Sequence, residues 1–407
     1  MTETVRIAEL GHAGDGIAEV DGQRIFVPLT LPGETVEIER SGARASLVDV
    51  IQPSADRVTP ACRHFGSCGG CALQHMDGAA YRAWKREVVR RSLLMHHIDA
   101  DVAPLVATPP GSRRRAIFSA VVVKDRLVLG FHRRAAHEIV RIEECPVLSH
   151  DIAAALPLIR SVAERAVRKR RQARITVTAG NGLDIAVDGG GRLDRNGLEA
   201  LGRFAREQTV ARLTVDGTDV FVNRRPEIAA GDSALLPSPG GFVQASAKAE
   251  TALAEAVLAH VGDAAPVADL FSGIGTFALR LARHAAVTAV EGDEALLSAL
   301  SQAVRHGRGL KPITTLRRDL FANPLAPAEL DRFGAIVFDP PAAGARTQSE
   351  TIAQSRVPKV VAVSCNPATL GRDARILLDG GYRLIRVLPV DQFLWSAEIE
   401  AVATFER

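Results

Sequence analysis

Strand-length apolar runs alternate with helix-length segments from residue 245 to the end of the chain, and this alternation restricts the possible folds most strongly. We expect helices at 247–261 and 277–284. The expected strands are 266–271, 287–291, 313–316, 335–338, 359–364, 383–390 and 401–405. Strands that alternate with helices form a doubly wound, mostly parallel sheet, whose ligands bind at the carboxyl ends of the strands. We therefore predict an α/β fold of this class.

The first fifty residues follow another pattern, with short strands expected at 5–10, 16–20, 23–27, 35–39 and 45–51. Strands of this length and spacing suit a small β-barrel of the oligonucleotide-binding type. A second boundary is expected near 237–241, because two prolines and two glycines continue neither a helix nor a strand. We predict three domains: a barrel at 1–52, a mixed α+β domain at 53–236 and the doubly wound domain at 237–407.

The charge of the chain is concentrated in its middle. Residues 81–175 hold 20 Lys and Arg against 9 Asp and Glu, although the whole chain has a net charge of only +3. Two runs stand out, Arg113-Arg114-Arg115 and the run 168–171, which contains Arg168, Lys169, Arg170 and Arg171. Such a segment suggests a polyanionic partner such as RNA, and we expect the first run to contact phosphates. Aromatic residues make up only 4% of the chain, which argues against an extensive base-stacking surface.

A glycine-rich turn, 269–277, follows the first strand of the doubly wound domain. Gly273 and Gly275 would let the backbone approach a ligand closely. Glu291 ends the next strand about 20 residues on, where a carboxylate can accept hydrogen bonds from ribose hydroxyls. Asp319 follows the third strand and is placed to meet an adenine edge. The turn lacks the third glycine of a dinucleotide-binding motif, so S-adenosylmethionine fits better than NAD.

Cys365 follows the strand 359–364 and begins the turn into a helix. Helix amides that point at a cysteine can lower its pKa, and a thiolate that adds to C6 of a pyrimidine makes C5 a carbon nucleophile. The methylated C5 must then lose its proton, which requires a general base. Asp339, in an Asp-Pro-Pro motif at the end of the preceding strand, could orient the pyrimidine through N3–H. A cysteine at a strand end is more often inert, so this interpretation depends on the accompanying motifs.

The other four cysteines have the spacing Cys62-x5-Cys68-x2-Cys71-x73-Cys145. An odd and sparse set of cysteines argues against a disulfide framework. Four thiolates from one loop and one distant segment suit a [4Fe–4S] cluster or a tetrahedral zinc ion. The number of ligands does not separate these two alternatives.

Together these motifs resemble those of the RNA uracil-5-methyltransferase family along nearly the whole chain. The motifs that carry the resemblance are the cysteine loop 62–71 with Gln74 and His75, the segments 130–134 and 145–148, Phe242-Val243-Gln244, Asp339-Pro340-Pro341, Ser364-Cys365-Asn366-Pro367, and Asp391-Gln392-Phe393 leading to Glu400. The barrel resembles the TRAM domain, an RNA-binding module. The resemblance implies a class I methyltransferase fold and favours an iron–sulfur cluster over zinc.

By this resemblance Cys365 is the nucleophile, Glu400 the base that removes the C5 proton, and Asp339 a further catalytic residue. The residues expected to contact the cofactor are Gln244, Asp269, Phe271, Gly273, Gly275, Glu291, Asp319 and Asp339. A TRAM-like barrel together with a cluster resembles the 23S rRNA enzymes of the family, whereas the bacterial tRNA enzymes typically have neither. A tRNA uridine C5 methyltransferase is the first alternative.

Three positions depart from the family pattern. The Asp-Pro motif is followed by Ala342 instead of arginine, the Phe-x-Gln motif by Ser246 instead of asparagine, and Glu398 replaces the histidine two residues before the base. Glu398 is therefore a rival base, because in a strand it would point to the same face as Glu400.

Two other classes of protein remain open. A non-catalytic RNA-binding protein could keep this architecture, although Cys365, Glu400 and the glycine turn argue against it. An amino-group methyltransferase also uses an Asp/Asn-Pro-Pro motif but needs no cysteine. The sequence has no apolar run as long as a membrane span and no signal-peptide pattern, so we expect a monomer in the cytoplasm.

Overall fold

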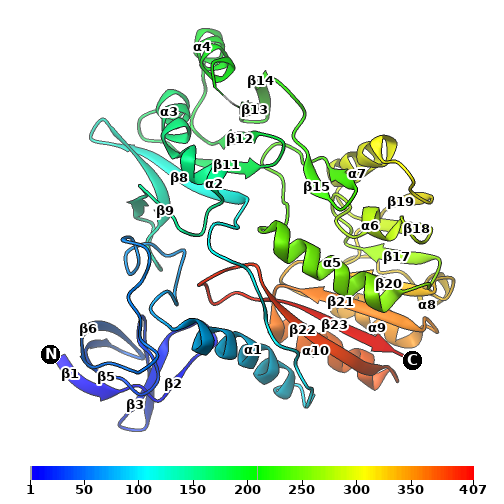
Figure 1. Ribbon diagram of the computed structural model, residues 1–407, viewed down its shortest axis with the longest axis horizontal. Coiled ribbons are helices and arrows are strands. Elements are labelled where there is room, and N and C mark those ends of the chain that lie inside the picture. Colours follow the sequence, from blue (N-terminus) through cyan, green and yellow to red (C-terminus); the bar gives the residue numbers. More distant parts are fainter. Residues whose placement is uncertain (1, 209) are drawn as a thin grey trace.

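The computed structural model describes residues 2–208 and 210–407, and it arranges them around three large sheets (Figure 1). The first sheet has the order β1-β5-β6-β4-β3-β2. Its strands are β1 (Thr2–Arg6), β2 (Glu9–Leu10), β3 (Gly16–Val20), β4 (Gln23–Val27), β5 (Thr35–Ser41) and β6 (Arg44–Gln52). The strand expected at 5–10 is split in two, because the chain changes its partner from β5 to β3 near Ala8.

The second sheet has the order β10-β9-β8-β11-β12-β13-β14. Its strands are β8 (Arg115–Val123), β9 (Arg126–His132), β10 (Ile139–Arg141), β11 (Gln172–Ala179), β12 (Leu183–Asp188), β13 (Val210–Val215) and β14 (Thr218–Val222). Its helices are α2 (His150–Ala154), α3 (Leu156–Ala166) and α4 (Arg195–Arg206), which share one apolar core with the sheet. Helix α3 ends at Ala166, because the chain becomes extended at Val167 and Arg168 N–H donates to the carbonyl oxygen of Gly190.

The third sheet confirms the predicted doubly wound fold, in the order β19-β18-β17-β20-β21-β23-β22-β7. Its strands are β17 (Val267–Leu270), β18 (Val287–Glu291), β19 (Ile313–Arg317), β20 (Ala335–Phe338), β21 (Lys359–Ser364), β22 (Arg383–Asp391), β23 (Glu400–Glu406) and β7 (Val106–Ala107). The strands from β19 to β21 are parallel, and β23 runs antiparallel to both of its neighbours.

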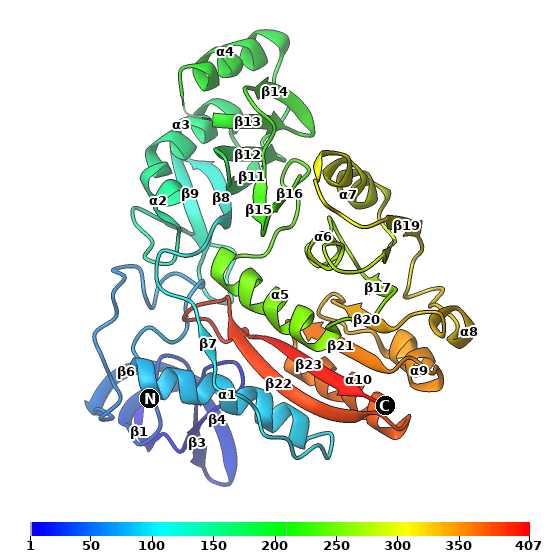
Figure 2. The ribbon, with the colours of Figure 1, turned by 45° about the vertical axis from the view of Figure 1, so that its right-hand side comes forward.

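Helices cover both faces of this third sheet (Figure 2). They are α5 (Ala247–Val261), α6 (Ala278–Leu281), α7 (Glu294–His306), α8 (Pro327–Leu330), α9 (Arg346–Gln354) and α10 (Pro367–Asp379). A small hairpin of β15 (Ile228–Ala230) and β16 (Ser233–Leu235) packs into the core on the face of α5 and α7.

The segment between the first two sheets reaches across to the third. Helix α1 (Gly78–Leu94) buries Val89 and Leu93 in the same core as α9 and α10, and β7 pairs with the end of β22. Helix α1 and strand β7 belong to the predicted middle domain, 53–236, but pack against the C-terminal sheet. The division of the chain into three consecutive domains therefore stays a prediction. No helix within the described residues is long and apolar enough to span a membrane.

Candidate active site

The predicted nucleophile, Cys365, lies in the turn between β21 and α10, at the carboxyl end of the strand. Asn366 caps α10 by accepting a hydrogen bond from Ala368 N–H at 3.1 Å, and its amide donates to the carbonyl oxygen of Ala342 at 3.0 Å. The Thr369 hydroxyl donates to the same carbonyl at 3.2 Å. The turn that carries Cys365 is thereby fixed to the loop that carries the Asp-Pro-Pro motif.

The environment of this thiol is the opposite of the expected one. Burial, together with the nearby carboxylates of Glu400 and Asp339, raises the pKa of Cys365 to about 11. The prediction of a lowered pKa is wrong, because burial and two acidic neighbours outweigh the first amides of α10. The unliganded protein therefore holds a protonated thiol at neutral pH.

An unbroken chain of side-chain hydrogen bonds joins the two carboxyl groups. Gln244 donates its amide N–H to Asp339 at 3.4 Å, and its carbonyl oxygen accepts from the amide of Gln392 at 2.8 Å. The same Gln392 amide donates to Glu400. Burial raises the pKa of Asp339 to about 7 and that of Glu400 to about 8, and the Asp339 charge contributes to the second shift. The site thus holds two acids that titrate near neutral pH, which is typical of catalytic centres.

The two candidate bases differ sharply in their surroundings. Strand β23 begins at Glu400, which is 2% exposed, whereas Glu398 is exposed in the preceding loop. The expectation that both point to one face of a strand is wrong, because residue 398 lies outside the strand. Only Glu400 belongs to the hydrogen-bonded chain.

The loop before Glu400 is held by residues far away in the sequence. Lys85 and Asp391, both fully buried, pair at 3.0 Å, and Tyr81 donates its hydroxyl to Asp391 at 2.7 Å. Lys85 also donates to the carbonyl oxygen of Glu398. Sequence reasoning missed Tyr81 and Lys85, because no local pattern connects α1 with a loop some 300 residues later. The sequence offers only a lysine among the other basic residues of this helix, and nothing in it shows that Lys85 is buried.

The glycine-rich turn contains a carboxylate that lacks a partner. Asp269 is 0% exposed and neither of its carboxyl oxygens accepts a well-aligned hydrogen bond. Burial raises its pKa well above the usual value, although the nearby backbone N–H of Ala278 acts in the opposite direction. Phe271 and Gly273 both have positive φ, 59° and 54°, and the Gly273 N–H donates to Glu291 at 3.0 Å. Asp319 accepts from Phe321 N–H at 2.9 Å. A buried, unpaired carboxyl group beside a glycine turn fits a polar ligand such as a nucleoside cofactor.

A buried ion cluster, which we call the arginine joint, connects this turn with the second sheet. Arg114 pairs with Glu250 of α5, and Arg280 pairs with the other oxygen of Glu250 at 2.6 Å. Arg280 also donates to the carbonyl oxygen of Thr276 in the glycine-rich turn, at 2.7 Å. Arg114 donates to the backbone carbonyl of Gln244 at 3.1 Å. The joint therefore contacts both the cofactor turn and the chain of hydrogen bonds between the carboxyl groups.

The joint corrects the expectation that Arg113-Arg114-Arg115 contacts RNA phosphates. Arg114 is only 8% exposed and pairs with Glu250, a carboxylate that it shares with Arg280. Arg115 donates to the carbonyl oxygens of Gly240 and Gly241 in the linker, and Arg113 is partly buried. Arg114 and Arg115 thus bind other segments of the chain, and the buried Arg114 is structural.

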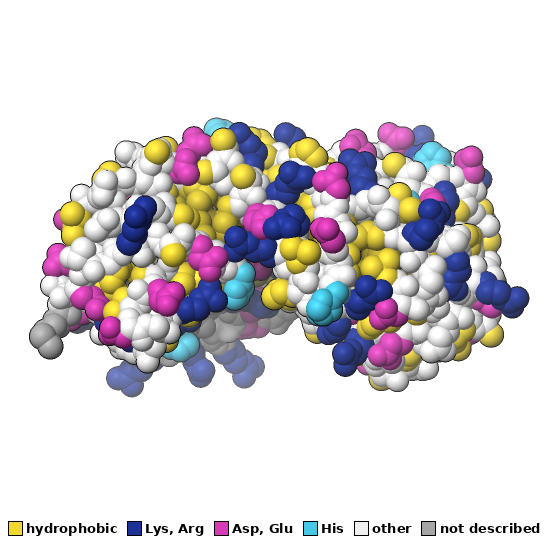
Figure 3. Space-filling model, turned by 90° about the horizontal axis from the view of Figure 1, so that it is seen from below, with side chains coloured by type: hydrophobic (Ala, Val, Ile, Leu, Met, Phe, Trp, Pro, Cys, Tyr) yellow, Lys and Arg dark blue, Asp and Glu magenta, His cyan; other side chains and the backbone are white. Residues whose placement is uncertain are grey.

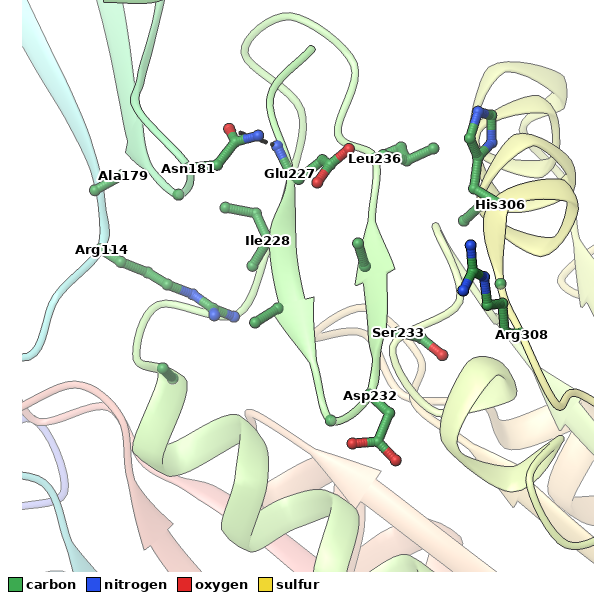
Figure 4. Close-up of a pocket in the computed structure, with 17 residues that line it drawn as sticks. Arg114, Ala179, Asn181, Glu227, Ile228, Asp232, Ser233, Leu236, His306 and Arg308 are labelled. Atoms are coloured by element: carbon green, nitrogen blue, oxygen red, sulfur yellow. Dashed lines mark hydrogen bonds between the residues drawn. The ribbon is translucent and has the colours of Figure 1, made fainter. Parts of the chain in front are cut away.

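Figure 4 shows the crevice into which Arg114 reaches, between the second sheet, the hairpin β15–β16 and α7. The crevice has a volume of about 740 Å³. None of the predicted catalytic, cofactor or cysteine residues lines this crevice, so it is separate from the candidate active site. A larger groove of about 1210 Å³ is lined by Cys365 and Glu398, by Trp84 and Arg91 of α1, and by residues of the barrel that include Phe26.

The four remaining cysteines, Cys62, Cys68, Cys71 and Cys145, line one pocket of about 560 Å³. Burial raises the pKa of Cys71 to about 12 and also raises those of Cys68 and Cys145. Within the described residues, no three His, Cys, Asp or Glu side chains are grouped closely enough to hold a metal ion. The structure therefore brings the predicted ligands to one place without forming a compact single-ion site.

Comparisons with known proteins agree with this architecture. A TRAM domain matches residues 1–39. An RNA methyltransferase of Brucella suis biovar 1 is 47% identical over 100% of this chain and 98% of its own length. The 23S rRNA (uracil(1939)-C(5))-methyltransferase RlmD of Shewanella frigidimarina is 32% identical over 99% of this chain and 95% of its own length.

A solved structure has the same overall fold. The tRNA (uracil-54, C5)-methyltransferase of Pyrococcus abyssi, in complex with S-adenosyl-L-homocysteine, superimposes with a TM-score of 0.76. The match covers 99% of both chains at 21% identity. With full-length relatives at 30% identity or more, the chain belongs to the RNA uracil-5-methyltransferase family.

Proposed function

We propose that this protein methylates C5 of a uridine in RNA through a covalent adduct on Cys365, with S-adenosylmethionine as the methyl donor. The observation that carries the proposal is the convergence of Cys365, Asp339 and Glu400, whose carboxyl groups are joined through Gln244 and Gln392. An amino-group methyltransferase would have no use for a thiol at this position. A non-catalytic RNA-binding protein would have no use for two buried acids that titrate near pH 7 to 8.

The order of proton movements follows from these acids. The Cys365 thiol passes its proton to the neighbouring ionised carboxylate of Asp339 as its sulfur bonds to C6, and the electron pair of the C5–C6 double bond moves to C5. S-adenosylmethionine supplies the methyl group that C5 takes up. Glu400, in its ionised form, then accepts the C5 proton, and the C6–S bond breaks to release the thiolate. The raised pKa of Glu400, about 8, makes it a stronger base than an ordinary carboxylate.

The cofactor would be held at the carboxyl ends of β17, β18 and β20. Asp269 lies in β17 and Phe271 in the turn after it, Glu291 ends β18, and Asp339 follows β20. The unpaired Asp269 carboxyl group is the strongest support, because a buried polar group without a partner is costly. A bound ligand that donates a hydrogen bond there would remove that cost.

For the substrate we propose 23S rRNA. The support is the RlmD relative, which acts on 23S rRNA and is 32% identical to this chain along its length. The Pyrococcus enzyme, which acts on tRNA, shares the fold at 21% identity, and tRNA is the alternative. We further propose that the protein works as a monomer in the cytoplasm.

We also propose that Cys62, Cys68, Cys71 and Cys145 hold a [4Fe–4S] cluster. The support is that all four thiols line one pocket of about 560 Å³, and four thiolates are the usual ligand set of such a cluster. Next to this pocket, the N–H groups of Ala72 and Leu73 donate to the carbonyl oxygen of Trp395, so the cysteine loop also supports the loop before Glu400.

The test of the activity uses labelled S-adenosylmethionine with unmodified 23S rRNA and tRNA transcripts. The proposal predicts 5-methyluridine in 23S rRNA, located by mass mapping, and no product with Cys365→Ala. Methylation of tRNA alone would favour the alternative substrate. Product formation by Cys365→Ala would contradict the mechanism.

The test of the cluster is anaerobic purification followed by metal analysis and absorption spectroscopy. We expect a brown protein with four iron atoms per chain that bleaches and loses iron in air. Stoichiometric zinc without iron would contradict the cluster.

A further inference from the structure

The second run of basic residues, 168–171, has a very different environment from the first. All four of its side chains are exposed, and they lie beyond the end of α3. Lys169 is 75% exposed and pairs only with Asp125, which is equally exposed. Within the described part of the chain, Arg168, Arg170 and Arg171 form no ion pair. These cations are therefore available to a partner.

Two residues of the run, Arg168 and Lys169, form one rim of a hollow that other basic residues complete. A pocket of about 550 Å³ lies between the β8–β9 turn, β10 and the end of α3. Five cationic side chains line it, and we call them the basic crevice: Arg126, Arg141, Arg160, Arg168 and Lys169. Its acidic lining residues are Asp125 and Glu164. Cations thus outnumber carboxylates around a concave surface.

Stabilisation of α3 does not account for this grouping. Cations in the last turn of a helix interact favourably with its dipole, and Arg165 does so in α3. Arg126 and Arg141, however, come from strands β9 and β10, and Arg168 lies two residues past the end of the helix. The dipole effect fades within the last turn of the helix. It therefore does not explain why cationic side chains from three separate elements meet at this pocket.

We propose that the basic crevice docks the phosphate backbone of structured RNA at a place separate from the groove beside Cys365. Figures 1 and 2 agree in placing α3 with the second sheet, away from α1 and α10, which flank that groove. On the face shown in Figure 3, by contrast, Lys and Arg side chains are interspersed with Asp and Glu. The inference rests on the proposed function, because the RNA is taken to be the substrate.

The proposal predicts that long RNA uses the crevice and that a short RNA confined to the catalytic groove does not. The test variant carries Arg126→Ala, Arg141→Ala and Arg168→Ala, all at exposed positions. The matched control carries Arg356→Ala, Arg383→Ala and Arg386→Ala, three exposed arginines on or near the third sheet. Both variants lose the same charge, so a difference between them reports position.

Affinity is measured against salt concentration for a long 23S rRNA fragment and for a short uridine-containing hairpin. We expect the test variant to bind the long fragment about tenfold more weakly, with a salt slope smaller by about 2, because each lost phosphate contact removes roughly 0.7–0.9 from the slope. Its affinity for the hairpin and its melting temperature should match those of the wild type and of the control variant.

Three results would overturn the proposal: unchanged affinity for the long fragment, an equal loss in the control variant, or an equal loss for the hairpin. Binding is measured without methyl transfer, so failure of the proposed activity is visible separately. The wild-type protein could bind the long fragment with a salt-dependent affinity that falls in the test variant, yet methylate no uridine. That result would refute the proposed activity but not the proposed role of the basic crevice.

Discussion

The two basic runs look alike in the sequence and do unlike things in the structure. In Arg113-Arg114-Arg115, the middle side chain pairs with Glu250 inside the arginine joint, and both neighbours donate to backbone carbonyl groups. In 168–171, every side chain is exposed. The difference arises because the first run sits where β8 meets the linker and α5, while the second sits in a turn beyond a helix. A run of arginines indicates RNA binding only if its side chains do not form ion pairs with carboxylates elsewhere in the chain.

The largest expected difference between the runs is in stability. Arg114→Met removes one of the two arginines that pair with the buried Glu250 carboxylate and leaves Arg280 in place, so we expect a loss of about 1–3 kcal/mol, typical of a lost hydrogen bond to a buried charged group. Arg170→Met, the matched control at an exposed position, should change the free energy of unfolding by less than about 0.5 kcal/mol. Urea denaturation measures the free energy of unfolding of both variants. Equal losses in the two variants would contradict the difference between the runs.

A second prediction concerns the hydrogen bond from Gln392 to Glu400. Through Gln244, this bond belongs to the chain that the arginine joint contacts. The Gln392 amide donates to Glu400 and thereby lowers its pKa, so Gln392→Leu should raise that pKa further above about 8. Glu400 must be ionised to accept the C5 proton, so the acidic limb of the pH–rate profile should move to higher pH. We expect the rate at pH 7 to fall about tenfold, which corresponds to a lost hydrogen bond to a charged group.

The pH profile of Gln392→Leu separates this role from a merely structural one. A variant that was only destabilised would lose activity at all pH values in proportion to its unfolded fraction. An unshifted acidic limb would mean that Gln392 does not act on Glu400.

A further effect is expected on the pH dependence of stability. Asp339 and Glu400 have raised pKa values in the folded protein, about 7 and about 8, so the folded state binds more protons than the unfolded state between about pH 4.5 and 8. Stability should therefore fall as the pH rises through this window. Glu400→Gln should flatten the decline, as followed by urea denaturation at several pH values, whereas Arg170→Met should leave it unchanged. A decline equally steep in Glu400→Gln would contradict the raised pKa.

The parts of the fold that depend on local pattern were predictable. Parallel strands buried on both faces give continuous apolar runs, and β17, β18, β20 and β21 fall where such runs occur. The pairing of β7 was not predictable, because two residues carry no periodicity. The packing of α1 against the third sheet was equally hidden, since its anchor, the pair of Lys85 and Asp391, joins positions 306 residues apart.

The active site shows the same division. The motifs supplied Cys365, Glu400 and Asp339, but the protonation of the thiol depends on carboxylates that only the tertiary fold brings near it. The choice between Glu398 and Glu400 likewise depended on where β23 begins. Electrostatic environments of this kind are properties of the folded chain, and sequence motifs name the groups without fixing their charge.

The most direct test of the mechanism compares Cys365→Ala with Glu400→Gln on unmodified RNA, using denaturing gels and labelled S-adenosylmethionine. We expect Cys365→Ala to form neither adduct nor product, and Glu400→Gln to accumulate a methylated protein–RNA adduct, because the C5 proton stays in place and elimination stalls. Glu398→Gln, at the exposed neighbouring position, is the matched control and should turn over. An adduct trapped by Glu398→Gln, with normal turnover by Glu400→Gln, would contradict the assignment of the base.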